Sequence, residues 1–339
     1  MITSSLSKES KYLMALAATC LAFSTAALAA EGHFKRTLHV TGPVQLSVQT
    51  GAGTIAVRTG GDSVVEVEGT IRAWNGLLSN GDAEKRVRYL ASHPPVEQHG
   101  NVIEIGKITE SSMRHNISIS YELVVPANTQ LSSKTGSGDQ TVDGISGPLE
   151  AETGSGDIKG SNIGGNVQAK TGSGEIVMEN VKEGVRASTG SGDIRATGVG
   201  GSVRASTGSG SVTVQQTGAG DTRVNTGSGN IVLKNTQGLV HAKTASGSIT
   251  AEGGGKSPWY LESVSGNVSV RVPPNVCLDL HAHTVSGSKS TNRPLTLQGT
   301  ISKREITGKA GKIVVAKSPP GKKNSWRMDS GNIHIDWVA

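Results

Sequence analysis

The sequence predicts an all-β protein, a right-handed parallel β-helix or β-solenoid with coils of about 18 residues. The tetrapeptide Thr-Gly-Ser-Gly recurs at intervals of 18 or 19 residues, which is typical of a solenoid. The residues flanking each copy alternate between apolar and polar, which indicates short strands. The chain contains 46 Gly among 339 residues and only 3% aromatic residues, so a thick globular core is not expected.

The remaining composition excludes two other classes of glycine-rich chain. Charged residues make up 18% of the sequence, the net charge is +6, and Val and Ile recur throughout. A disordered chain would combine low hydrophobicity with a high net charge. Collagen would place glycine at every third residue, which this chain does not do.

Residues 1–29 are predicted to be a secretory signal peptide. Lys8 and Lys11 precede an apolar run from Leu13 to Leu28, and Ala27-Leu28-Ala29 matches a small-x-small cleavage site. Lipidation at Cys20 and an uncleaved membrane anchor are the weaker alternatives. Cleavage would leave Cys277 as a single cysteine, so no internal disulfide is expected. No later segment is apolar enough over a sufficient length to span a membrane, so the protein is expected to be exported: periplasmic, on the cell surface or secreted.

Residues 30–126 are predicted to form a β-rich N-terminal cap. Residues 82–91 form its one expected helix, which ends before Pro94. The alternating patterns that predict strands lie at residues 44–48, 55–57, 64–67, 102–105 and 117–125.

Residues 127–339 are predicted to form the β-solenoid. Each coil should contain one strand before and through the repeat threonine and a second after it, joined by glycine-rich corners. The threonine should point inward, so that its hydroxyl can bond along the solenoid axis. Trp326 and Trp337 concentrate aromatic bulk in an expected C-terminal capping coil. The repeat begins at Thr135, Thr153, Thr171, Thr189, Thr207 and Thr226, with degenerate copies at Thr244, Ser263, Thr284, Thr307 and Met328 and an outlying copy at Thr50.

The segment Tyr121-Glu-Leu-Val-Val-Pro126, then Leu131 and Thr135-Gly-Ser-Gly-Asp139, is followed by recurring Gly-x-Val-x-Ala-x-Thr-Gly-Ser-Gly-Asp-Ile. This pattern resembles a bacterial exported family of adhesin-like proteins with β-strand repeats, a domain of unknown function. The resemblance extends from about Phe34 to the C-terminus. It implies a right-handed β-helix-like solenoid in an exported protein, and it supplies no catalytic or ligand-binding residue.

A column of residues three positions before each repeat threonine is the main candidate binding site. It should point outward and place Arg186, Arg204, Arg223 and His241 one above another at strand spacing. Such a basic ladder could hold an anionic polymer such as lipopolysaccharide or an acidic polysaccharide. The plainer interpretation of the same column is a solvated strand face, with its arginines partly neutralised by acidic neighbours. Few aromatic residues accompany the basic ones, so specific nucleic-acid recognition is not expected. The complete column is Glu150, Gln168, Arg186, Arg204, Arg223, His241, Tyr260 and His281, and the acidic neighbours are Glu183, Asp193 and Asp221.

Acidic residues at the glycine-rich corners could suggest calcium, which needs six to eight oxygen ligands. Serine, asparagine and glutamate also occupy this position, which fits a structural hydrogen bond better than a metal column. His281 and His283 share one strand face but lack a further ligand, so no metal site and no cofactor are expected. The corner residues are Asp139, Asp157, Glu175, Asp193, Ser211, Asp221, Asn230 and Ser248.

The function expected from these features is that of a non-enzymatic, adhesin-like solenoid at the cell envelope or surface, in contact with envelope glycans or other anionic polymers. No nucleophile elbow, phosphate-binding loop or His-Glu-x-x-His motif indicates an enzyme. Two alternatives remain: a β-helix lyase or hydrolase acting on acidic polysaccharide, and an envelope scaffold unit that assembles with copies of itself. The sequence leaves the oligomeric state open.

Overall fold

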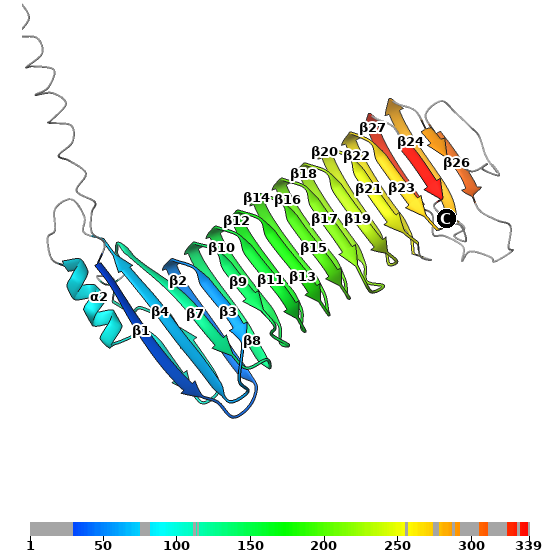
Figure 1. The fold of residues 1–339 in the computed structure, drawn as a ribbon. Helices are drawn as coiled ribbons and strands as arrows, with labels where there is room; N and C mark the ends of the chain where they lie inside the picture. Colours follow the sequence, from blue (N-terminus) through cyan, green and yellow to red (C-terminus); the bar gives the residue numbers. More distant parts are fainter. Residues whose placement is uncertain are drawn as a thin grey trace, which may run out of the picture.

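The computed structural model describes residues 30–74, 82–110, 113, 115–254, 257–273, 278–286, 289–291, 305–310, 324–330 and 333–337. The predicted signal peptide (residues 1–29), Cys20 and Cys277 lie outside these residues. The described chain is an all-β solenoid with one short helix near its N-terminal end, as predicted (Figure 1). The handedness of its coil stays a prediction. None of the helices in the described segments has the length and apolarity needed to cross a membrane.

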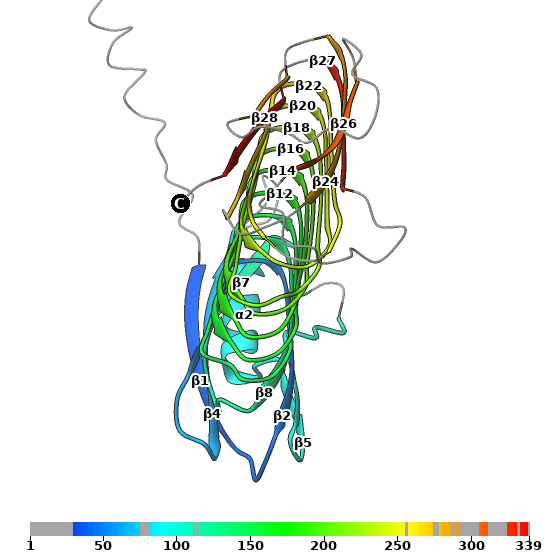
Figure 2. The ribbon, with the colours of Figure 1, turned by 90° about the vertical axis from the view of Figure 1, so that its right-hand side faces the viewer.

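Two parallel sheets form the body of the solenoid, and every coil contributes one strand to each (Figures 1 and 2). Sheet B takes the strand that ends in the repeat, and sheet A takes the strand that follows it. Strands of sheet B are β8 (Thr129–Ser137), β10 (Leu149–Ser155), β12 (Val167–Ser173), β14 (Val185–Ser191), β16 (Val203–Ser209), β18 (Thr222–Ser228), β20 (Val240–Ser246) and β22 (Trp259–Ser265). Strands of sheet A are β9 (Gln140–Asp143), β11 (Ile158–Ile163), β13 (Ile176–Val181), β15 (Ile194–Val199), β17 (Val212–Gln216), β19 (Ile231–Thr236), β21 (Ile249–Gly253) and β23 (Val268–Val272).

The repeat threonines form one buried column along the axis, as predicted. Thr153, Thr171 and Thr189 are 3–4% exposed and pair in register with one another. The Thr171 hydroxyl donates to the carbonyl of Gly156 in the preceding coil at 3.0 Å, and the same bond recurs in successive coils. The threonines therefore bond along the axis to the backbone, which satisfies a polar side chain inside a thin core.

The acidic corner residues also bond along the axis. Asp139 accepts the backbone N–H of Asp157 at 2.9 Å, and Asp193 accepts that of Ser211 at 2.8 Å. The hydroxyl of Ser211 repeats this bond to the backbone N–H of Asn230 at 3.3 Å. The structure thus agrees with a structural role for this column. Asp221 belongs to the opposite corner, where it accepts the N–H of Leu239 at 2.9 Å.

The coil register begins earlier in the chain than residue 127. The outlying copy at Thr50 lies on β2 (Val44–Ala52), which pairs in parallel with β8 and places Thr50 beside Thr135. The strand β3 (Ile55–Thr59) pairs in the same way with β9, so residues 44–59 form a coil within the predicted cap. The rest of the cap covers this coil: α2 (Asp82–Ser92) packs on β1 (Ala30–His39) and β4 (Val64–Ala73), and β5 (Val96–His99), β6 (Val102–Ile105) and β7 (Ile117–Val125) complete the two sheets.

At the C-terminal end the order of the strands differs from the order of the chain. The strands β27 (Asn324–Ser330) and β28 (Ile333–Trp337) stack directly on β22 and β23. The earlier strands β24 (Leu278–Ser286) and β25 (Lys289–Thr291) lie outside them. The copy at Thr307 is not a parallel coil, because its strand β26 (Glu305–Ala310) pairs antiparallel with β24. The predicted coil around Met328 therefore exists, but β24 and β25 lie beyond it at the C-terminal end of the two sheets.

Candidate functional site

The predicted basic ladder lies on the outer face of sheet B. Arg186, Arg204 and Arg223 are exposed and are direct partners on the adjacent strands β14, β16 and β18. His241 and Tyr260 continue the column on β20 and β22. Their rings meet edge to face, with centroids 6.3 Å apart. The alternation of strand residues holds this column outward because the valines and alanines beside it fill the core.

The position of His281 in the column differs from a simple count of coils. Ser325 on β27 is the partner of Tyr260, and His281 on β24 follows only after Ser325. His241 and His281 are thus three strand steps apart rather than two. Among the described residues, no group of three or more His, Cys, Asp or Glu side chains is arranged to hold a metal ion.

The arginines of the ladder have no ionic partner within the part of the chain that the structure describes. The acidic residues expected to neutralise them are engaged elsewhere. Asp193 and Asp221 accept backbone N–H groups at the corners, and Glu183 accepts a hydrogen bond from the side-chain amide of Asn166. These three carboxylates therefore form no ion pair with the ladder, whose arginines are exposed to solvent.

The charges beside the ladder are neutralised at its two flanks. On the flank toward the cap, the two carboxylate oxygens of Glu152 lie 3.6 Å from the Nζ atom of Lys134 and 3.3 Å from the Nζ atom of Lys170. The hydrogen bond from Lys170 and its charge hold the pKa of Glu152 below its usual range. On the flank toward the C-terminus, the Nζ atom of Lys243 lies 3.3 Å from a carboxylate oxygen of Glu262. On the outer face of sheet B, the arginines without an ion-pair partner in the described structure therefore lie on the three middle coils.

A shallow groove of about 660 Å³ runs over one end of the sheet B strands and includes part of the ladder. Its polar lining follows the column from Ser132 and Glu150 through Gln168 to Arg186 and Arg204. Glu150 is the single carboxylate among the residues that line it. The groove crosses successive strands, so an elongated ligand in it would lie along the solenoid axis.

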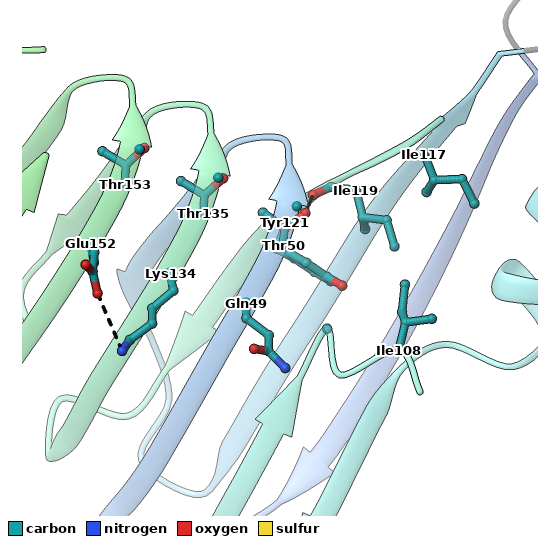
Figure 3. Close-up of a pocket in the computed structure, with 14 residues that line it drawn as sticks. Gln49, Thr50, Ile108, Ile117, Ile119, Tyr121, Lys134, Thr135, Glu152 and Thr153 are labelled. Atoms are coloured by element: carbon teal, nitrogen blue, oxygen red, sulfur yellow. Dashed lines mark hydrogen bonds and ion pairs between the residues drawn. The ribbon is translucent and has the colours of Figure 1, made fainter. Parts of the chain in front are cut away.

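A second cavity, of about 490 Å³, lies where the cap meets the first coils (Figure 3). Gln49, Lys134 and Glu152 border one part of it, and Ile108, Ile117 and Ile119 border another. The hydroxyl of Tyr121 points toward the isoleucine side in Figure 3. Tyr121 is fully buried, its hydroxyl has no hydrogen-bond partner in the described structure, and burial raises its pKa.

We expect Tyr121→Phe to raise the free energy of unfolding by about 1 kcal/mol, because it removes a buried hydroxyl that lacks a partner. The ring would keep its edge-to-face contact with Phe34, whose centroid lies 6.4 Å away. Urea denaturation of the two proteins, followed by circular dichroism, measures the difference. A loss of stability would contradict this interpretation, since it would mean that the hydroxyl is hydrogen-bonded in solution.

The sequence pattern predicted the ladder but not three other features of this face and of the cap. The ion pairs on the flanks, the groove and the cavity beside Tyr121 all depend on contacts between coils and with the cap. The Val-Pro segment did place Tyr121 on a strand, but alternation alone does not reveal whether a buried hydroxyl has a partner.

Comparison with known proteins gives one family match. The model of the family described as Toastrack DUF4097 matches residues 165–336, just over half of the chain. No curated protein matches the chain significantly.

Three solved structures are similar over most of the chain, at low identity. A putative cell adhesion protein from Clostridium sporogenes is 11% identical, covers 91% of this chain and 100% of its own, and has a TM-score of 0.19. A putative adhesin from Bacteroides fragilis is 12% identical, with coverage of 90% and 97% and a TM-score of 0.28. A putative adhesin from Parabacteroides distasonis is 13% identical, with the same coverage and TM-score. Similarity at this level does not identify what the present chain binds.

Proposed function

The chain belongs to the Toastrack family DUF4097, and we propose that it is a non-enzymatic, adhesin-like binding solenoid exported to the cell envelope or surface. In this proposal residues 1–29 are removed as a signal peptide, and residues 30–126, which include the first coil at residues 44–59, cap the solenoid. The outer face of sheet B binds glycans or other anionic polymers of the envelope. Arg186, Arg204, Arg223 and His241 supply the contacts.

The observation that supports this proposal is the set of three exposed arginines in register without carboxylate partners. An exposed ion pair contributes little by itself, typically less than about 1 kcal/mol. A stack of coils repeats the same contact, so a polymer can engage several arginines at once and accumulate affinity. The stiffness of two continuous sheets keeps these contacts aligned.

We expect the triple variant Arg186→Ser, Arg204→Ser, Arg223→Ser to bind anionic envelope glycans about tenfold more weakly than the wild type. Binding to immobilised lipopolysaccharide and to acidic polysaccharide, measured by biolayer interferometry at low and at physiological salt, tests this. The difference should shrink as salt rises, because salt screens exposed charges.

The matched control removes the same number of positive charges from the opposite face. Lys159, Lys234 and Arg271 are exposed on sheet A, and Lys159→Ser, Lys234→Ser, Arg271→Ser should leave binding close to that of the wild type. If the two triple variants lose the same amount of affinity, the loss follows from the lower net charge and not from the position of the arginines. Unchanged binding in the arginine variant would remove the ladder from the proposal.

A further inference from the structure

The spacing of the ladder is fixed by the backbone of the solenoid. Arg186, Arg204 and Arg223 are direct partners on adjacent parallel strands. Neighbouring strands lie about 4.8 Å apart, so one guanidinium group is available at each such step. The side chains can bend, but their Cα atoms cannot change this interval without breaking the sheet.

A strip of small, uncharged residues runs beside the arginines on the same face. Ser188, Ser206 and Asn225 are exposed two positions after each arginine and pair in register. The next outward position holds the repeat glycine, as at Gly190 and Gly208, where a Cβ would lie 2.6 Å from a carbonyl oxygen of the preceding coil. This strip therefore offers hydroxyl and amide groups without bulk or charge, which suits hydrogen bonding to sugar hydroxyls.

The two ends of the ladder differ in charge. Toward the cap, the column passes through Gln168 to Glu150, whose carboxylate would repel an anionic group. Toward the C-terminus it passes to His241 and to Tyr260, which is 39% exposed and offers an aromatic surface. The column can therefore hold a short run of anionic groups on the three arginines, with one further polar and one aromatic contact beyond them.

From this geometry we propose that the ladder binds a linear acidic polysaccharide with a carboxylate on every sugar, laid along the solenoid axis. Successive carboxylates lie against Arg186, Arg204 and Arg223, and the sugar hydroxyls face the serine and asparagine strip. The inference rests on the proposed function and adds the spacing of the charges in the ligand. One sugar unit is close in length to one strand step, so a chain with a carboxylate on every second sugar would leave at least one of the three arginines without a carboxylate partner.

The test uses the full mature chain and two series of oligosaccharides, with isothermal titration calorimetry at low salt. One series is oligogalacturonate of two to six sugars, which has a carboxylate on every sugar. The other consists of hyaluronan fragments, which have a carboxylate on every second sugar, and the two are compared at equal numbers of carboxylates. We expect oligogalacturonate affinity to rise several-fold between two and three sugars and then to level off, because the ladder has three arginines.

Two further results are expected. A hyaluronan fragment with three carboxylates should bind several-fold more weakly than the trimer of galacturonate. Arg204→Ser should remove the rise in affinity with length, because it interrupts the run, whereas Lys234→Ser on sheet A should not.

The outcomes separate this inference from the proposed function. Equal affinities for the two series at equal charge would overturn the inference but leave anionic binding by the ladder intact. If neither series binds, but the triple arginine variant still binds lipopolysaccharide more weakly than the wild type does, the inference is again overturned and anionic binding by the ladder again stands. If the triple variant and the wild type bind every polymer equally, both the inference and the proposed role of the ladder fail.

Discussion

Gly192→Ala is expected to lower the free energy of unfolding by about 2–4 kcal/mol. Gly192 has a φ of +148°, a conformation that residues with a side chain rarely adopt. A Cβ at this position would lie 2.1 Å from the carbonyl oxygen of Gly174 in the preceding coil. That oxygen belongs to the backbone of a stacked coil, so it cannot rotate away as a flexible side chain could.

Gly61→Ala is the matched control for this substitution. Gly61 lies outside the stacked coils, and a Cβ there would meet nothing within 4 Å. We expect Gly61→Ala to change stability by less than about 0.5 kcal/mol, as most surface substitutions do. Guanidinium denaturation followed by circular dichroism compares the two variants. Similar midpoints for both would show that the coils do not approach each other as closely as the structure has them.

The period of the repeat was enough to predict the coils, the buried threonine column and the outward column of arginines. This is because side chains alternate along a strand, and parallel pairing at a fixed period brings equivalent positions together. The motif at Thr50 also marks a coil, but the repeat period does not predict where that coil stacks. Thr50 lies beside Thr135 although 85 residues separate the two along the chain.

The C-terminal stacking order could not be predicted from the same pattern. The residues around Met328 and those around Thr284 both carry a recognisable repeat, so either could in principle pair with the Ser263 coil. The choice between them depends on non-local pairing, and the structure places Met328 beside Ser263.

For the candidate site, the sequence predicted which residues share a face but not which charges neutralise each other. Glu152 pairs with lysines of the coils on both sides of it, whereas Asp193 turns to a backbone N–H at its corner. Each of these carboxylates has a basic residue in its own coil or in an adjacent one. Only the geometry of the side chains decides whether the carboxylate forms an ion pair or accepts a backbone hydrogen bond.

Met178→Ala is expected to lower the free energy of unfolding by about 2–5 kcal/mol, because the core cannot refill the space that it leaves. Met178 is fully buried, and its neighbours in the same inward column are Gly160 and Ala196. Its sulfur lies 2.7 Å from the position that a Cβ of Gly160 would occupy, so this one long side chain fills the space above a glycine. Met178→Leu, which nearly keeps the volume, should cost less than about 1.5 kcal/mol.

A double-mutant cycle with Gly160→Ala tests whether the two positions share this space. In the wild type the new methyl group of Gly160→Ala forces Met178 to move, so the substitution should destabilise the protein. In the Met178→Ala background the same methyl group enters the vacated space, so it should stabilise. Urea denaturation of the four proteins gives the coupling free energy between positions 160 and 178. If Gly160→Ala has the same effect in both backgrounds, the narrow core does not depend on pairing a large residue with a small one between coils.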